Sequence, residues 1–171
     1  MTSFDPHDTS SAMAQLDRVK SLLSSSGVRF LDLSEVFGGV GIAVASGETE
    51  YVVITVMVGA EAALWVSSGV LKDVAHERLP ALEACNRWNQ SHAGYPCYLH
   101  DADSGWDVLM QQHYPLQLAL DVPLFFKAWS LEGMPRSTAD ARGEESFSRL
   151  EGSPYTWDEE DSHRLLMRSM F

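Results

Sequence analysis

The chain starts with a polar stretch, after which apolar residues recur at helical spacing. Residues 1–9 are expected to form a flexible leader, and Ser10 or Ser11 supplies a helix N-cap. Apolar side chains then repeat every three or four positions until Ser25, where Gly27 follows as a stop signal. The members of this stripe are Met13, Leu16, Val19, Leu22 and Leu23. The pattern predicts a first helix.

The hydrophobic period then changes to that of strands. Segments 29–33 (RFLDL), 39–46 (GVGIAVAS), 51–58 (YVVITVMV) and 63–71 (ALWVSSGVL) alternate or are rich in β-branched residues. The breaks at Gly47-Glu48 and Gly59-Ala60 are short enough for hairpins, so an antiparallel meander is predicted. In segment 51–58 both alternating sets are largely apolar, which indicates that both faces of the sheet are partly covered.

A second helix and a β-hairpin are predicted next. Leu79, Leu82, Cys85 and Trp88 recur every three residues between about residues 76 and 92, and Gly94 and Pro96 end the helix. The stretch YPCYLHD-ADSG-WDVLMQQHY then reads as two strands with Asp101 opposite Trp106. This register gives an apolar face of Cys97, Leu99, Trp106, Val108 and Met110, and a mixed face of Tyr98, His100, Asp107, Leu109 and Gln111.

The last third of the chain is expected to hold one more helix, a linker and a tail. Asp121 and Pro123 mark a helix start with the stripe Leu124, Phe125, Ala128 and Trp129, and Gly133 and Pro135 mark its end. Residues 134–155 read as a linker. A capping box at 156–159 then opens a short amphipathic helix.

The predicted fold class is therefore α+β: helix, meander of three to four strands, helix, two strands, helix, with helices packed on one antiparallel sheet. Residues 10–138 are assigned to this domain, and residues 139–171 to an acidic linker with an amphipathic C-terminal helix.

Composition narrows the class of partner. The chain has 171 residues, 45% of them hydrophobic, which suits a single domain with a proper core. Its net charge is −12, from 12 Lys and Arg against 24 Asp and Glu. Binding to nucleic acid or to an anionic membrane requires basic residues, so neither partner is expected. The polar start and the lack of a long apolar run predict no secretory signal and no membrane span, so the cytoplasm is the expected location.

A metal site is considered first among the candidate chemistries. His92, His100 and His113 lie near Asp101 and Asp103 in sequence. In the predicted hairpin, however, His100 and His113 are about 20 Å apart along the strands. Zinc or iron needs three or four convergent ligands, so no metal and no cofactor are expected.

Nucleophiles and nucleotide loops are weighed in the same way. Cys85 and Cys97 both fall on apolar faces, whereas a reactive thiolate needs a cationic, partly exposed setting. The glycines of FGGVGIAV (37–44) precede a strand and not a helix, unlike a dinucleotide loop. No catalytic residue is assigned, and an enzyme or metal protein using His100, Asp101, Asp103 or Cys97 ranks last among the functions considered.

Apolar and amide side chains remain as candidates for binding a polypeptide. The candidate partner-binding residues are Tyr98, Leu109, Phe126, Asn86 and Asn89. The candidate tail-docking residues are Trp157, Leu165, Leu166, Met167, Met170 and Phe171. Ordinary packing is the alternative for each of them, and Asn86 and Asn89 could hydrogen-bond either the adjacent loop or a partner backbone.

The element order, together with ALEACNRWN (81–89), the aromatic strand at 95–99 and the second strand ending in YPL (114–116), resembles the YbjN family over residues 12–133. That family is similar in architecture to the class I type III secretion chaperones, small acidic proteins that commonly pair as dimers. The resemblance implies a non-enzymatic, dimeric, chaperone-like module that binds an extended protein or peptide client at apolar patches and strand edges. A regulatory scaffold gated by its C-terminal helix is the alternative.

Overall fold

The structure, a computed structural model, describes residues 9–33, 41–58, 62–75, 78–102 and 105–170. Its centre is a six-stranded antiparallel sheet with the order β1-β2-β3-β4-β6-β5. The strands are β1 (Phe30–Asp32), β2 (Gly41–Ser46), β3 (Glu50–Val58), β4 (Ala62–Val74), β5 (Cys97–Ala102) and β6 (Gly105–Pro115). The α+β class and the meander followed by a hairpin are confirmed.

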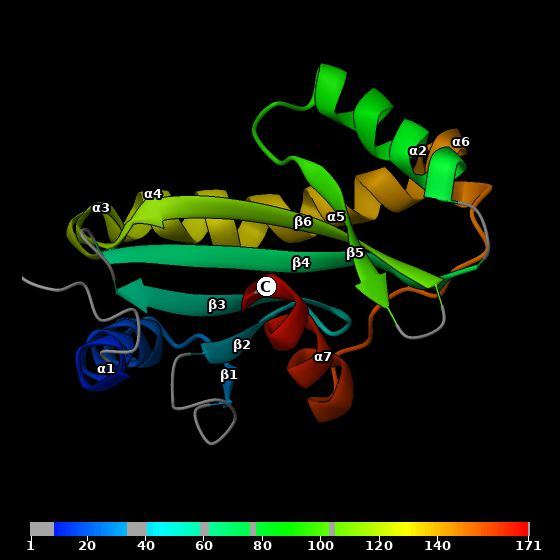
Figure 1. Cartoon of the computed structure of the whole chain (residues 1–171). Helices are drawn as coiled ribbons and strands as arrows, with labels where there is room; N and C mark the ends of the chain where they lie inside the picture. Colours follow the sequence, from blue (N-terminus) through cyan, green and yellow to red (C-terminus); the bar gives the residue numbers. More distant parts are fainter. Residues whose placement is uncertain (1–8, 34–40, 59–61, 76–77, 103–104, 171) are drawn as a thin grey trace, which may run out of the picture.

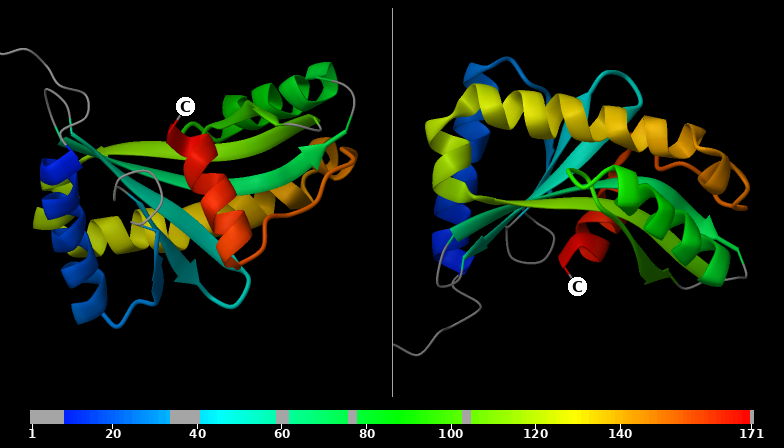
Figure 2. Two further views of the ribbon diagram at one scale, coloured as in Figure 1. Left: turned by 60° about the horizontal axis from the view of Figure 1, so that its bottom comes forward. Right: turned by 90° about the horizontal axis from the view of Figure 1, so that it is seen from above.

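Helices cover both faces of this sheet. One face carries α1 (Thr9–Ser25), α2 (Arg78–Ser91) and a helical layer that starts at α3 (Leu116–Asp121). The layer continues through α4 (Pro123–Phe126), the π-helical η1 (Lys127–Gly133), α5 (Met134–Gly143) and α6 (Glu145–Ser148). The opposite face carries α7 (Glu159–Met170), and the two views of Figure 2 show it on the far side of the sheet from α5.

The two-sided pattern of segment 51–58 explains why both faces need cover. Val52, Ile54 and Val56 are fully buried in the core shared with α1, α2 and α5. Tyr51 and Val53 point to the other side and pack in a second cluster, to which α7 contributes Leu165 and Leu166. Burying a large aliphatic or aromatic side chain stabilises a fold by about 1.5–3 kcal/mol. Exposing either face of β3 to solvent would therefore destabilise the fold.

The register of the hairpin agrees with the prediction. Asp101 pairs with Trp106, Leu99 with Val108, and Cys97 with Met110. The apolar face joins the larger core, where Cys97, Val108 and Met110 are buried. The hairpin around residues 47–49 is also present between β2 and β3. The leader at residues 1–8 and the turn at Gly59-Ala60 lie outside the described residues.

The predicted end of the third helix is wrong. Helical structure runs from Pro123 to Gly143 without stopping at Gly133 or Pro135. The seven-residue π-helix ends at Gly133, directly before the turn that contains Pro135. Proline lacks the N–H that an α-helix interior requires, and a change of hydrogen-bond spacing accommodates such a residue. The start is also different, because Val122 precedes the helix without a side-chain cap and Asp121 accepts a hydrogen bond from Gln117.

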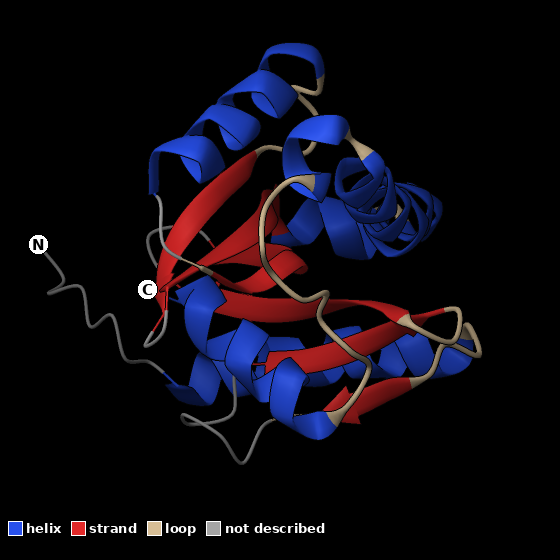
Figure 3. Ribbon diagram, turned by 90° about the vertical axis from the view of Figure 1, so that its right-hand side faces the viewer, coloured by secondary structure: helices blue, strands red, loops and turns tan. Residues whose placement is uncertain are grey.

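Residues 134–148 are helical and packed, so the linker expected over 134–155 is much shorter. Met134, Thr138 and Ala141 are fully buried against the sheet, and Phe147 is 1% exposed. The high content of Ser, Gly and charged residues belongs to the outer surface of α5 and α6. Only residues 149–158 form a connection, which Figure 3 shows as an extended segment leading to α7.

The predicted apolar stripe of this helix faces outward. Leu124 is 82% exposed, and Phe125 and Trp129 are 41% and 38% exposed, whereas Phe126 is buried at 2%. Leu124, Phe125 and Phe126 belong to α4, before the π-helix begins at Lys127, so the predicted stripe took the wrong side of α4. From Lys127 onward the wider π-helical turn changes the period, so a regular 3.6-residue spacing does not describe the rest of the helix. Met13 of α1 and Leu79 of α2, at 47% and 65%, also lie outside the core that their stripes predicted.

The two cysteines provide a test of the core. Cys85 and Cys97 are free and buried, and burial raises the pKa of the Cys85 thiol to about 12 and that of the Cys97 thiol further still. We expect neither thiol to react with a thiol-specific chromogenic reagent at pH 8 until the protein is unfolded in denaturant, when both react. Rapid reaction of the folded protein would contradict this packing.

Candidate functional site: the sheet face beneath the C-terminal helix

The five residues predicted to bind a partner do not share one surface. Leu109 is fully buried and Tyr98 partly buried on the face beneath α7. Phe126 is buried in the core of the opposite face. Asn86 is exposed on α2, and Asn89, one turn later, is partly buried.

Asn89 hydrogen-bonds the adjacent strand. Its side-chain amide donates to the carbonyl oxygen of Cys97 at 2.8 Å, and its side-chain oxygen accepts from the Cys97 N–H at 2.7 Å. These two bonds mimic a neighbouring strand at the start of β5, which is an edge of the sheet. An edge whose backbone groups are already paired resists the addition of another strand at that point.

The residues predicted for the tail lie mainly on the sheet. Leu165 and Leu166 are fully buried, with a solvent-exposed fraction of 0%. The Trp157 ring lies 5.3 Å from the ring of Tyr51, and Met170 packs at the margin of the same cluster. Met167 is half-buried, and Phe171 lies outside the described residues.

Two glycines of the sheet leave room for the side chains that dock there. A Cβ at Gly41 would lie 2.4 Å from a methyl carbon of Leu166. A Cβ at Gly69 would lie 2.1 Å from the ring of Tyr155, which precedes α7. Because real atoms do not approach so closely, Leu166 and Tyr155 occupy space that only glycine provides. The face and the segment 155–170 are therefore complementary in shape.

A buried carboxylate sits at the centre of this interface. Asp107 of β6 has no exposed side-chain surface, and Arg164 of α7 reaches it with two hydrogen bonds of 2.7 and 3.0 Å. The Tyr155 hydroxyl donates to the same carboxylate at 2.6 Å. Arg168, one turn beyond Arg164, places its Nε 3.7 Å from Asp107. An unpaired buried charge is strongly destabilising, so Asp107 requires these partners.

Asp73 supplies the second carboxylate for Arg164. The two guanidinium Nη atoms lie 2.9 and 3.1 Å from the Asp73 oxygens. Asp73 has φ of 53°, a conformation that short polar side chains tolerate best, and it lies where the β4–β6 register shifts. Its backbone N–H donates to Asp107 at 3.0 Å, so the bulge itself helps to neutralise the buried charge.

A second ion pair holds the first turn of α7, and here the cation belongs to the sheet and the anion to the helix. Lys72 Nζ lies 2.6 Å from both oxygens of Asp161, which is 5% exposed. The same carboxylate accepts from the N–H and the hydroxyl of Thr156 at 2.6 Å. Asp158 accepts from the Asp161 N–H at 2.7 Å, so Asp158, and not Thr156 of the predicted capping box, caps the helix.

The connection before α7 is joined to the sheet as well. β3 pairs with β4 only as far as Val53 opposite Ser67. Beyond that ladder, Lys72 and Ser153 exchange backbone hydrogen bonds of 2.7 and 2.9 Å, and the Ala75 N–H donates to Glu151 at 2.8 Å. Where β3 no longer pairs with β4, a short piece of the connection pairs with β4 instead.

Two members of this cluster, Tyr155 and Arg164, have a raised pKa. Burial, and then the charge of Asp107, raise the pKa of Tyr155, which stays a phenol and a hydrogen-bond donor. Burial alone would lower the pKa of Arg164, but its hydrogen bonds to Asp107 and Asp73 outweigh this effect and raise it. Tyr155 therefore acts as a hydrogen-bond donor and Arg164 as a cation, and both hold the helix in place over Asp107.

The histidines and acidic residues considered for a metal are spread out. His100 pairs opposite Asp107 near one end of the hairpin, while His113 stacks on Trp65 at 4.4 Å near the other. Within the described ranges no three His, Cys, Asp or Glu side chains come together as a possible metal site.

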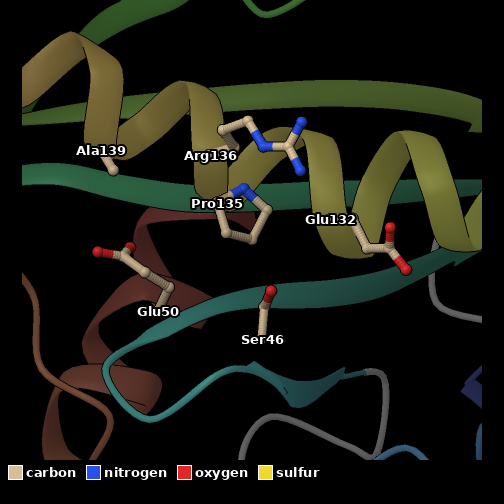
Figure 4. A pocket seen from close by; sticks show the side chains of 6 residues that line it. All are labelled: Ser46, Glu50, Glu132, Pro135, Arg136 and Ala139. Atoms are coloured by element: carbon tan, nitrogen blue, oxygen red, sulfur yellow. The ribbon is translucent and has the colours of Figure 1, made fainter.

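A shallow hollow lies between α5 and the β2–β3 hairpin (Figure 4). Glu132, Pro135, Arg136 and Ala139 line it from one helical face, and Ser46 and Glu50 line it from the strands. Glu50 also forms an ion pair with Arg142. This open hollow of about 380 Å³ is lined by two carboxylates and one arginine, Arg136. The Glu50–Arg142 ion pair beside it links α5 to the β2–β3 hairpin, so we assign these charged side chains a structural role.

A row of exposed apolar side chains forms another surface feature. Leu118, Val122, Phe125 and Trp129 follow one another along α3, α4 and η1, and each is about 40% exposed. Phe125 and Trp129 have ring centroids 6.0 Å apart, and Trp129 stacks on Tyr95 at 5.1 Å. We call this set the aromatic row.

Sequence reasoning missed the charged residues of the α7 interface. Asp73, Asp107, Arg164 and Lys72 come from three elements, and their side chains meet only in the folded chain. One signal was available: the segment DSHRLLMR (161–168) places Arg164 and Arg168 on either side of a leucine pair. Two cations flanking the apolar centre of a docked helix indicate carboxylates beneath it.

Comparison with known proteins identifies the family. The model of the YbjN family, described as a putative bacterial sensory transduction regulator, matches residues 15–120. The chain belongs to the YbjN family. A crystal structure of YbjN, described as a putative transcription regulator from E. coli, has a TM-score of 0.54 and 13% identity, and the alignment covers 79% of this chain and 93% of that one. This likeness shows the shared YbjN-like fold.

The match also sets limits. No curated protein matches the chain. The architecture of class I type III secretion chaperones, expected from the sequence, stays a prediction. In the described part of this YbjN-family chain no helix is long and apolar enough to cross a membrane. The family match ends at residue 120, so α7 lies beyond it.

Asn89 provides a test of the closed edge. In Asn89→Ala both side-chain bonds to Cys97 disappear and a partly buried backbone N–H and C=O lose their partner, which costs about 1–3 kcal/mol. Asn86→Ala, on the exposed flank of the same helix, should change stability by less than about 0.5 kcal/mol. Urea unfolding measures both. Equal effects of the two substitutions would contradict the bridging role of Asn89.

Proposed function

We propose that this YbjN-family protein is a non-enzymatic regulator that binds a polypeptide partner on the sheet face beneath α7, with α7 acting as a gate. The observation that carries the proposal is the arrangement of Asp107, Arg164 and Asp73. One arginine between two carboxylates of the sheet forms the central polar contact of the helix. Such an interface has two defined states, because a competing cation can replace the arginine.

The position of α7 in the chain supports the gate. It follows the connection 149–158, in which Glu151, Gly152, Ser153 and Pro154 are exposed. Its apolar side and its two arginines face the sheet, whereas Glu159 and Glu160 face water. In this proposal α7 leaves while the six strands stay paired, because no strand of the sheet runs through it.

We place the client on a face of the sheet and not along a strand edge, which is the mode expected from the sequence. Binding of an extended client along the β5 edge is disfavoured at its start, where Asn89 pairs with Cys97. The free edge of β4 beyond β3 is taken by Ser153. The proposed chaperone-like client therefore binds to the face and not to an edge. Two buried free cysteines suit the reducing cytoplasm in which we place the protein.

A second candidate function is self-association through the aromatic row. Exposed aromatic rings on a contiguous helical surface are enriched at interfaces, and π-helical turns are frequent at functional sites. Pairing of two copies here would leave the α7 face open to a partner. Dimerisation and partner binding would then use opposite sides of the molecule.

The gate is tested with Arg164→Gln. The substitution leaves Asp107 buried without its bidentate partner, an effect on the order of 3–5 kcal/mol for a fully buried pair, and Arg164 is 26% exposed, so we expect the lower part of that range. The loss should appear as release of α7. Amide hydrogen exchange in residues 159–170 should accelerate by about 100-fold, since each 1.4 kcal/mol is a factor of ten.

Arg149→Gln is the matched control, because Arg149 forms an exposed ion pair with Glu145 on α6. Exposed pairs contribute little, so exchange in α7 should be unchanged. In Arg164→Gln itself, amide exchange in β4 and β6, which belong to the core packed by α1, α2 and α5, should stay as slow as in the wild type. Global unfolding of that variant, with α7 and the core exchanging together, would show that α7 is an integral part of the fold and not a gate.

The aromatic row is tested by light scattering. The wild-type chain should have twice its 18.9 kDa mass, and the double substitution Phe125→Ser with Trp129→Ser should reduce it to the mass of one chain. Leu79→Ser, at an exposed leucine of α2, serves as the control and should remain dimeric. A wild-type monomer, or a dimer unaffected by the double substitution, would contradict self-association through this row.

A further inference from the structure

We infer that the face beneath α7 recognises a partner's amphipathic helix with the pattern Asp-x-x-Arg-Leu-Leu-x-Arg, which reproduces residues 161–168 of this chain. The inference rests on the proposed gate and adds the chemistry of the partner. The occupant is a helix of another protein, and its acidic and basic residues set the direction in which it lies.

Charge complementarity gives the first argument. When α7 leaves, Arg164 and Arg168 leave Asp107, and Arg164 leaves Asp73. The sheet then presents two carboxylates, those of Asp107 and Asp73, and the Asp107 carboxylate is buried while α7 is in place. At the other end Lys72 loses Asp161. A helix must therefore bring cations to the centre of the face and an anion to Lys72.

The order of these charges defines a direction. Asp161 precedes Arg164 by three residues, so the two lie on neighbouring positions of one side of a helix. A helix laid in the reverse direction would bring its carboxylate toward Asp107 and its arginine toward Lys72. Both contacts would then join like charges, which disfavours that orientation.

Shape gives the second argument. Leu165 and Leu166 are the two fully buried leucines of α7, and Leu166 fits against Gly41, where a Cβ would overlap it. Tyr51, Val53 and Leu109 supply the apolar floor around them. A leucine pair placed directly after the first arginine satisfies this floor while the guanidinium reaches Asp107. A purely apolar helix would leave Asp107 unpaired, and an acidic helix would repel it.

Tethering explains why such a face stays closed without its partner. A segment joined by a short connection acts at an effective concentration in the millimolar range, and a free helix must compete with it. The apparent dissociation constant of a partner rises by the factor by which the closed state exceeds the open one. A mutation that loosens α7 should therefore strengthen binding of a helix that keeps the arginines.

The test uses the full chain and two synthetic peptides. One fluorescently labelled peptide has the sequence TWDEEDSHRLLMRSMF, and the other has glutamine in place of both arginines. Fluorescence anisotropy should show that Arg164→Gln binds the arginine peptide at least about tenfold more tightly than the wild-type chain does. The arginine peptide should bind Arg164→Gln at least about tenfold more tightly than the glutamine peptide.

Two further variants keep the test decisive. Arg149→Gln should bind both peptides as the wild type does, because its ion pair is remote from the face. Leu166→Ala loosens α7 through packing and leaves every charge in place, so it should also bind the arginine peptide more tightly than the wild type. It replaces Arg164→Gln if that variant does not fold.

The outcomes separate the inference from the proposed function. If hydrogen exchange shows that α7 is released but the two peptides bind equally, the partner pattern is wrong and the gate stands. If α7 stays protected in both loosened variants, the gate itself is wrong. If a loosened variant forms a dimer with protected α7 and binds neither peptide, α7 has been exchanged between copies, and the inference of a foreign helix is overturned.

Discussion

The burial of one carboxylate organises this protein. Asp107 lies on β6, an inner strand of the sheet, and has no contact with solvent. A strand position facing a core would ordinarily hold an apolar residue, and an ionised group there is tolerated only when donors surround it. Four donors do so: the Asp73 N–H, the Tyr155 hydroxyl and two nitrogens of Arg164. Three of these donors belong to Tyr155 and Arg164, so the sheet and the segment 155–164 depend on each other.

Because Asp107 needs donors from α7, the contact between α7 and the sheet is specific. Alternation along β3 makes both faces apolar. One face packs in the core with α1, α2 and α5, and the other packs against α7, which lies in front of the strands in Figure 1 while α4 and α5 lie behind them. Any amphipathic helix could shield the second face by hydrophobic burial alone, which is non-directional. Asp107, Asp73 and Lys72 remove that freedom, because they demand cations and an anion at set positions. Buried polar groups of this kind contribute selectivity at a cost in stability.

Local patterns predicted the parts of this fold that depend on neighbours in sequence. The hairpin register followed from the apolar sets Cys97–Leu99 and Trp106–Met110, because a shift by one residue would turn every side chain to the wrong face. The course of the helix beyond Gly133 could not be predicted in this way. The side of α4 that faces the core is that of Phe126 and not of Phe125. Gly133, at the end of the π-helix, has no room for a side chain, because a Cβ there would lie 2.2 Å from the Tyr95 hydroxyl. The α7 site was missed for the same reason: Arg164 meets carboxylates 57 and 91 positions earlier, and no short window contains both partners.

Edges and faces of the sheet are controlled by different chemistry, and this difference bears on how a regulator could respond. At the β5 edge Asn89 supplies fixed hydrogen bonds from a helix that is itself packed through Cys85 and Trp88, so this closure moves only if the core moves. At the α7 face the covering element is a short amphipathic helix, and its central polar contact is electrostatic. Under the proposed gate, a change in that one contact would open the face while the edge stays closed. A partner would then have to match three charges, those of Asp107, Asp73 and Lys72, and the apolar floor beneath Leu166, and the remaining structure could stay as it is.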